Sequence, residues 1–225
     1  MFLSRALEEL AVANGLEHID YCSYFVKVHP DQGSQLFDKV TLARAFHPNG
    51  CHYGTLRRAY PIPSHELYRS VLLLRDPRDC LVSHYYSVRD SHTLNNRGNL
   101  EARKEALRTD IDQWVLSKAA QYAQDFEQFH SRLVGKPGVL FLRYEEMVTA
   151  FPDFLRKVVA HTGLDQDQEA VARILEEADF EVSGENLLSH KRSVKPGNHL
   201  KKLKPETIDR LNGALAEVLE LFDYR

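Results

Sequence analysis

The feature that most constrains the fold is a run of four apolar residues, 71–74, that ends abruptly at Arg75. The run does not alternate with polar residues, which is typical of a short strand buried on both faces of a mostly parallel sheet. Asp76 can cap a following helix, and Pro77 suits the first turn of that helix, where a backbone N–H would be unpaired. The sequence therefore predicts that Arg75 lies at the carboxyl end of a core strand, before a helix N-terminus.

This edge of an open α/β sheet is where ligands bind, and helix N-termini favour phosphate groups. The guanidinium of Arg75 and the hydroxyl of Ser83, further along the predicted helix, would together suit a phosphate monoester. An alternative interpretation is that Arg75 pairs with Asp79 and only holds the loop together. This stretch alone does not decide between the two.

The composition fits a single α/β domain, because 225 residues with 43% hydrophobic content can bury a sizeable core. The net charge of -3 gives no global reason to expect nucleic acid or an anionic membrane as a partner. Cys22, Cys51 and Cys80 are far apart and favour free thiols in a reducing compartment. No apolar run approaches the length of a membrane span, and charges interrupt the N-terminus too early for a signal peptide. We therefore expect a cytoplasmic protein.

The order of the predicted elements indicates one domain over residues 1–225. An amphipathic helix opens the chain, and the segment 139–142 repeats the pattern of an apolar strand that ends in polar residues. Helices are expected at 100–108, 112–133, 151–162 and 167–178, and one last helix from Pro205. The stretch 89–133 would be a helical insertion over the site, since such insertions often form a wall or lid.

A basic segment, 191–204, carries six cations and no acidic residue. It fits an anion clamp, and it also fits a solvated loop, which is the usual role of a run of charges. The segment lacks the interleaved aromatic residues of a single-stranded nucleic-acid platform.

Taken in order, these motifs resemble the cytosolic-type sulfotransferases, which use 3'-phosphoadenosine 5'-phosphosulfate as donor. Residues 74–79 (Leu-Arg-Asp-Pro-Arg-Asp), followed by Ser83, look like the 3'-phosphate motif of that family. The resemblance implies that Arg75 and Ser83 hold the 3'-phosphate. It also implies that Tyr144, after the strand 140–143, and Phe180 line the adenine.

The segment from Arg192 to Gly197 resembles the late R-K-G-x-x-G phosphate loop of the family. Arg192 and Gly197 match that pattern, whereas Ser193 and Val194 replace its lysine and glycine. The neighbouring lysines at positions 191 and 195 could compensate for this departure.

The resemblance also implies a histidine base, which the family places at a strand end some twenty residues before the phosphate arginine. His52 stands in that position and is our choice, His47 is the second candidate, and a plain surface histidine is the structural alternative. A histidine can accept the proton of an acceptor hydroxyl near neutral pH, so that the freed oxygen attacks sulfur in line. No metal is expected, and no H-E-x-x-H motif occurs.

The implied fold is a P-loop-like three-layer α/β sandwich with a central, mostly parallel sheet flanked by helices, apparently without its first strand. The family begins with that strand and a P-K-S-G-T-type loop for the 5'-phosphosulfate, whereas this chain opens near Phe2, where the loop would meet its helix. A late start site, a truncation or a non-catalytic relative that binds the adenosine bisphosphate would each explain this. A nucleotide kinase ranks lower, because no G-x-x-x-x-G-K-[ST] loop occurs.

The acceptor cannot be read from the sequence beyond a hydroxyl or amine on a small molecule, glycan or lipid. Residues 52–58 and 89–133 are expected to shape its pocket. Arg57 and Arg58 would favour an anionic acceptor or serve as surface charge. The oligomeric state is also open.

Overall fold

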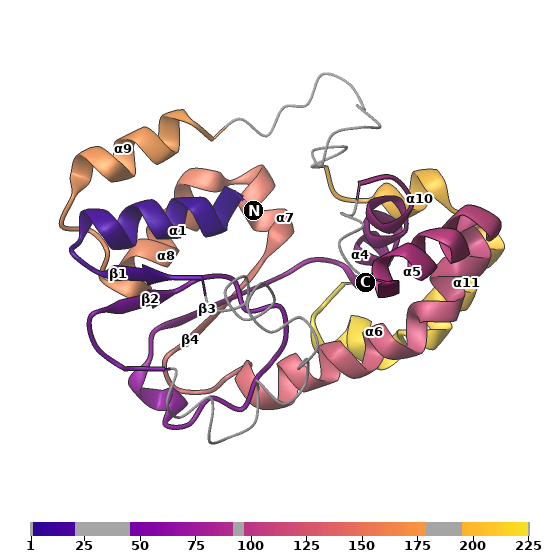
Figure 1. Ribbon diagram of the computed structural model, residues 1–225, viewed down its shortest axis with the longest axis horizontal. Helices are drawn as coiled ribbons and strands as arrows, with labels where there is room; N and C mark the ends of the chain where they lie inside the picture. The colour runs from indigo at the N-terminus through magenta and orange to yellow at the C-terminus, as the bar shows by residue number, and fades with distance from the viewer. Residues whose placement is uncertain (1, 21–45, 92–96, 179–194, 225) are drawn as a thin grey trace. The chain divides into compact units, whose positions relative to one another are not determined.

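The computed structural model describes residues 2–20, 46–91, 97–178 and 195–224 (Figure 1). The chain divides into two compact units, each assembled from several segments. The first unit contains Met1–Leu72, Ser131–Leu142 and Ala150–Ala178, and the second contains Leu73–His130, Arg143–Thr149 and Asp179–Arg225. Residues 24–29, whose sequence is typical of a further strand, lie outside the described residues.

In the first unit, strands β1 (Glu17–Ile19) and β2 (Cys51–Tyr53) pair in parallel, with His18 opposite His52. Helix α1 (Phe2–Ala13) packs against both strands and against α9 (Gln168–Glu176), as Figure 1 shows. The helix buries a single stripe of residues, Leu3, Ala6, Leu10 and Ala11. The amphipathic helix predicted at the start of the chain is therefore confirmed.

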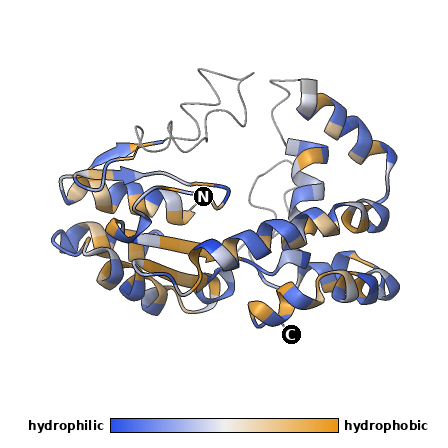
Figure 2. Ribbon diagram, turned by 90° about the horizontal axis from the view of Figure 1, so that it is seen from below, coloured by the Kyte–Doolittle hydropathy of each residue, from blue (hydrophilic) through white to orange (hydrophobic). Residues whose placement is uncertain are grey.

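The second pair of strands is β3 (Ser70–Leu74) with β4 (Val139–Arg143). Their starts are joined by a hydrogen bond of 2.7 Å from the Ser70 N–H to the Gly138 carbonyl oxygen. The carbonyl oxygens of both residues lie 3.1 Å from Nε2 of His161, on α8 (Phe151–Thr162). Most residues of β3 and β4 are hydrophobic, and strands of this kind are orange in Figure 2. Both strands and helix α8 are where the sequence predicted them.

In the second unit, α4 (Pro77–Tyr86) runs into a π-helix, η3 (Ser87–Ser91), and α5 (Arg97–Arg108) and α6 (Ile111–Leu133) follow. The helices predicted at 100–108 and 112–133 are thus confirmed, with starts one to three residues earlier. The remaining helices are short: α7 (Tyr144–Thr149), α10 (Asn198–Lys202), α11 (Pro205–Ala214) and α12 (Ala216–Leu221). A 3-10 turn, η2 (His65–Leu67), precedes β3.

The C-terminal helix differs from the prediction, because it is broken into α11 and α12 at Leu215, whose φ of -111° is not helical. Arg78 links these helices to the start of α4. Its Nη1 donates to Asn212 Oδ1 at 2.7 Å, and its Nη2 donates to the Tyr224 carbonyl oxygen at 2.8 Å. Among the described helices, none combines the length and the apolar composition needed to cross a membrane.

Gly138 gives a test of this framework, with Gly135 as a matched control. Both have a left-handed backbone, with φ of +76° and +71°. A Cβ at Gly138 would lie 2.3 Å from the Tyr68 carbonyl oxygen, whereas one at Gly135 meets no described atom within 4 Å. We expect Gly135→Ala to lower the free energy of unfolding by about 1–2 kcal/mol. Gly138→Ala should lower the free energy of unfolding by about 1–3 kcal/mol more than Gly135→Ala. The added Cβ would force the backbone at Tyr68 to move. Equal losses in urea denaturation would contradict this packing.

Candidate functional site

The first part of the site is the junction between β3 and α4. Asp76 caps α4, since its Oδ1 accepts a hydrogen bond of 2.8 Å from the Arg78 N–H, and Pro77 is the first helical residue. This is the arrangement that the sequence predicted. Arg75 therefore lies directly after the strand and directly before a capped helix.

The guanidinium of Arg75 is largely buried, with its side chain 14% exposed. Its Nη2 donates to Asp79 Oδ2 at 2.9 Å and to the Lys195 carbonyl oxygen at 3.3 Å. Its central carbon lies 4.7 Å from the centre of the Tyr144 ring. Its Nε is buried and has no hydrogen-bond acceptor among the described residues. The pairing with Asp79 does occur, but Arg75 also keeps one buried donor for which the described part of the chain offers no acceptor.

Asp79 is the centre of this network, and its side chain is completely buried. Oδ1 accepts from the backbone N–H of His199 at 2.9 Å and from its Nδ1 at 2.7 Å. Oδ2 accepts from Arg75 and, at 2.9 Å, from the Gly197 N–H. Burial alone would raise the pKa of Asp79, but the hydrogen bonds from His199 and the charge of Arg75 outweigh it and hold the pKa well below its usual range. The carboxylate therefore ties α4 to a segment 120 residues later.

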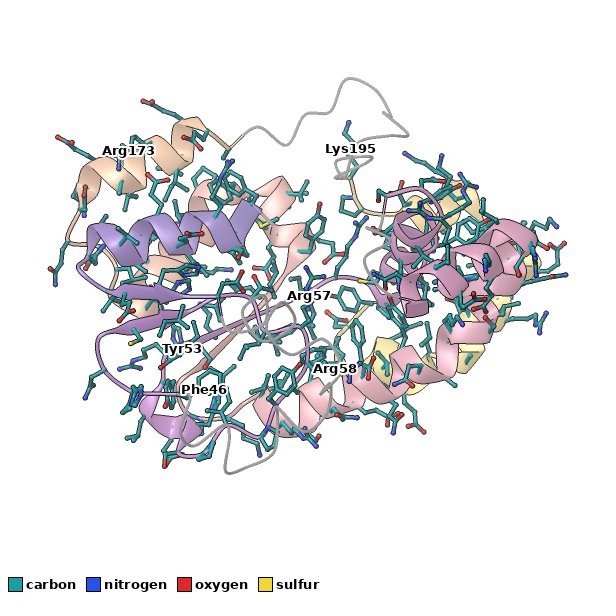
Figure 3. The ribbon with its side chains drawn as sticks, in the orientation of Figure 1. Phe46, Tyr53, Arg57, Arg58, Arg173 and Lys195 are labelled. Carbon is teal, nitrogen blue, oxygen red and sulfur yellow. The ribbon has the colours of Figure 1, made fainter. Side chains whose placement is uncertain are left out.

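Gly197, which the sequence assigns to a phosphate loop, lies beside Asp79. Its φ of +82° is left-handed and precedes α10, and its N–H is occupied by Asp79. Lys195, two residues earlier, is exposed and labelled in Figure 3. The predicted site residues Phe180 and Arg192 lie outside the described residues, as does Lys191.

The carboxyl end of β4 contributes Tyr144 and Glu145, the first residues of α7. Tyr144 covers Arg75, and Glu145 Oε1 accepts a hydrogen bond of 3.1 Å from the Asp76 N–H. Burial raises the pKa of both side chains. The ends of the two predicted strands therefore converge on Arg75.

Ser83 is on the same face of α4 as Asp79, one turn further along, since residues four apart are neighbours on a helix. Its side chain is exposed and makes no hydrogen bond with the described residues. The prediction that Ser83 supplies a hydroxyl to the anion requires this exposed position on α4. Cys80, also in α4, is partly buried, and desolvation of its thiol raises the pKa to about 12.

The predicted base, His52, is in the first unit and is described separately. Its Nδ1 lies 2.9 Å from Nδ1 of His18, and the two rings stack with their centres 5.0 Å apart. Burial, and then the neighbouring His18, lowers the pKa of His52 to about 4, so the ring is neutral at pH 7. Tyr53, the next residue along β2, packs against Phe46 with ring centres 4.5 Å apart (Figure 3).

His47, the second candidate base, is exposed on the loop before β2. Its backbone N–H donates to the Tyr53 hydroxyl at 2.6 Å, and its carbonyl oxygen accepts from that hydroxyl at 3.3 Å. His52 is more enclosed and has a side-chain partner, which is the environment expected of a functional imidazole. Arg57 and Arg58, in the segment after β2, are exposed (Figure 3).

Two residues of these sites, His18 and His199, were missed from the sequence, and Asp79 was considered only as a partner of Arg75. Only Asp79 left a signal, its spacing of four from Arg75. The described residues contain no group of three or more His, Cys, Asp or Glu side chains arranged to hold a metal ion.

Comparison with known proteins adds two findings. A family model described as a sulfotransferase domain matches residues 64–207. Among solved structures, the chain is similar to the mouse sulfotransferase SULT7A1 complexed with PAP, with a TM-score of 0.65 and 16% sequence identity over 100% of this chain and 84% of that one. At this identity the similarity establishes the fold, an α/β arrangement of parallel strands flanked by helices, as predicted. A search of curated proteins found no match.

The buried carboxylate can be tested by Asp79→Asn, with the exposed Asp153→Asn as control. We expect Asp79→Asn to lower the free energy of unfolding by about 3–5 kcal/mol at pH 7, since Arg75 loses its buried partner. Asp153→Asn removes the exposed ion pair with Arg156 and should change the free energy of unfolding by less than about 1 kcal/mol. Because the pKa of Asp79 is depressed, its contribution is present above its ordinary pKa and declines as the pH falls below about 4. Urea titrations at several pH values measure this, and similar losses for both variants would contradict the network.

Proposed function

This chain belongs to the sulfotransferase family, and we propose that it transfers a sulfuryl group from 3'-phosphoadenosine 5'-phosphosulfate to a hydroxyl or amine. The observation that carries the proposal is Arg75, a largely buried guanidinium at the carboxyl end of a core strand, with one N–H that no residue of the described ranges accepts. An unsatisfied buried donor costs free energy, and a phosphate oxygen is the acceptor that a guanidinium binds best. The acceptor substrate would be a small molecule, a glycan or a lipid.

We assign the 3'-phosphate to Arg75 and Ser83, with Arg192 and Gly197 on the opposite segment. Three facts support the part of this assignment that the structure describes. Arg75 is held rigidly by Asp79, Ser83 has a free hydroxyl one turn along α4, and Gly197 is held beside Arg75 by the same carboxylate. Rigid donors lose little conformational entropy when an anion binds.

The adenine would lie against Tyr144 and Phe180. Tyr144 offers a partly buried ring next to Arg75, and an aromatic face of this kind can stack on a nucleobase. Since Arg75 already contacts this ring, base and phosphate would be bound by adjacent groups.

His52 is proposed as the general base. Its imidazole is neutral at physiological pH, so it can take the proton of the acceptor group on Nε2. The acceptor oxygen or nitrogen then forms a bond to sulfur while the bond from sulfur to the 5'-phosphate oxygen breaks, and adenosine 3',5'-bisphosphate leaves with that electron pair. Positioning and charge neutralisation would supply most of the catalysis, without a metal.

We also propose a cytoplasmic location. Cys51 and Cys80 are free thiols, which is the usual state of cysteines in a reducing compartment.

Titration of the full chain with adenosine 3',5'-bisphosphate tests the nucleotide site. We expect Arg75→Ala to weaken binding at least about tenfold, because a hydrogen bond to a charged group contributes about 1.5–3 kcal/mol. Arg75→Lys keeps a cation for Asp79 and should give an intermediate affinity. Arg156→Ala, at an exposed pair on α8, is the control and should not change binding.

The same titration separates the competing functions. If the wild-type chain does not bind the bisphosphate, the proposal is wrong. Binding without transfer to any acceptor would identify a non-catalytic relative. A response to ATP with magnesium, but not to the bisphosphate, would instead favour a nucleotide kinase.

The assignment of the base is tested by His52→Asn, with His47→Asn as the matched control. With 35S-labelled donor and a panel of phenols, sugars and amines, His52→Asn should reduce turnover roughly 100- to 10,000-fold without changing bisphosphate affinity. His47→Asn should be unaffected, and the reverse result would move the role to His47.

In the wild type, activity should persist as the pH falls through 6.5 and be lost near about 4, because His52 is active only when neutral.

A further inference from the structure

His52 is the last of three polar side chains that lie in a row in the first unit. The row runs from Glu8 on α1 through His18 on β1 to His52 on β2. The parallel register of β1 and β2 places His18 directly opposite His52, and their Nδ1 atoms are 2.9 Å apart. On the far side of His18, its Nε2 lies 3.7 Å from Oε2 of Glu8, on α1. The His18 side chain is 18% exposed and that of Glu8 is 50% exposed, so the row leads from solvent to the strand pair.

The carboxylate decides the direction of the hydrogen bond between the two rings. Each neutral imidazole has one N–H and one lone pair, so one of the two Nδ1 atoms must donate and the other accept. Glu8 can only accept when ionised, and this favours the proton of His18 on Nε2, the atom that faces it. His18 Nδ1 is then the acceptor, and the donor must be His52 Nδ1–H.

We propose that Glu8 and His18 are positioning residues that hold His52 in its Nδ1–H form and so leave its Nε2 lone pair free to accept the proton of the sulfuryl acceptor. The role of His52 as base rests on the function proposed above; the arrangement of protons among the three side chains does not. A histidine base that lacked this partner would occupy both neutral forms, of which only one has the lone pair on Nε2.

The arrangement also stabilises His52 once it has taken the proton. The new N–H bond forms at Nε2, while the Nδ1–H stays in its hydrogen bond to His18, so no second proton transfer is required. The positive charge on His52 is stabilised by the hydrogen bond to the lone pair of His18. The negative charge of Glu8 stabilises it further through the His18 ring. His52 thus faces one imidazole, from β1, and that imidazole in turn faces one carboxylate, from α1.

Gly54 keeps the His18 ring in place. Its N–H donates to the Ile19 carbonyl oxygen at 2.8 Å and so continues the pairing of the two strands. A Cβ at this position would lie 3.1 Å from Cε1 of His18 and 3.4 Å from Cα of Asp20, which is tighter than ordinary contact. The absence of a side chain at residue 54 therefore gives the ring the room that the stacked arrangement needs.

The arrangement can be read directly by NMR on the full chain with 15N-labelled histidine, without donor or acceptor. At pH 7, two-bond 1H–15N correlations should show His52 as the Nδ1–H form and His18 as the Nε2–H form. Glu8→Gln should shift His52 toward its Nε2–H form. Without the carboxylate charge, nothing favours the proton of His18 on Nε2 over Nδ1. Glu9→Gln is the matched control, since Glu9 instead faces Arg173 Nε at 3.1 Å, and it should leave both rings unchanged. An Nε2–H form of His52 in the wild type, or no shift in Glu8→Gln, would overturn the proposal.

Activity measurements then separate positioning from mere support of the fold. We expect His18→Leu to lower kcat at least tenfold with little change in KM for the donor. His18→Asn, whose side-chain oxygen can still accept from His52 Nδ1–H, should restore part of that loss and also serves if the leucine variant does not fold. Equal losses in kcat for His18→Leu and His18→Asn would overturn the positioning role. If no acceptor is sulfated by the wild type, the function proposed above fails, whereas the NMR result still decides the arrangement of protons.

Discussion

The proposed anion site depends on one buried charge, the carboxylate of Asp79. Removing a carboxylate from water is costly unless its lone pairs are filled, and here two backbone N–H groups, a guanidinium and an imidazole fill them. The residue is in the first turn of α4, where the helix dipole also favours a negative charge. Because the same oxygens hold Arg75 and Gly197, the strand end and the later segment keep their relation only while Asp79 is ionised.

This carboxylate does not cancel the attraction of the site for an anion. Both of its oxygens face donors within the protein, and Arg75 uses a single nitrogen, Nη2, to bind it. The planar guanidinium therefore keeps other N–H groups for a ligand, and the buried Nε has no acceptor among the described residues. His199 adds a further hydrogen bond to the same carboxylate, at 2.7 Å from its Nδ1, and so occupies the oxygen that Arg75 does not use.

The local structure could be predicted because its causes are local. The apolar run 71–74, the capping Asp76 and the proline after it determine a strand and a helix start within seven residues, and β3 and α4 follow that pattern. The partners of Asp79 and His52 could not be predicted in this way. His199 is 120 residues from Asp79, and His18 is 34 residues from His52. Each of these contacts depends on how the whole chain folds, and it leaves no periodic signal in the sequence. Leu215 was missed for a related reason, since the core spacing of residues 205–222 continues through the break.

The histidine pair resolves a conflict that any general base in this position would meet. Burial keeps His52 neutral, which a base requires before the reaction, yet burial also opposes the positive charge that the base must carry once it has taken the proton. Two adjacent imidazolium ions would repel each other, so at most one of the stacked rings can be charged at low cost. A carboxylate behind the second ring stabilises that one charge without touching the first ring. The parallel register of β1 and β2 makes this possible, because it sets one histidine opposite the other and leaves Nε2 of His52 clear of the hydrogen bond that orients it.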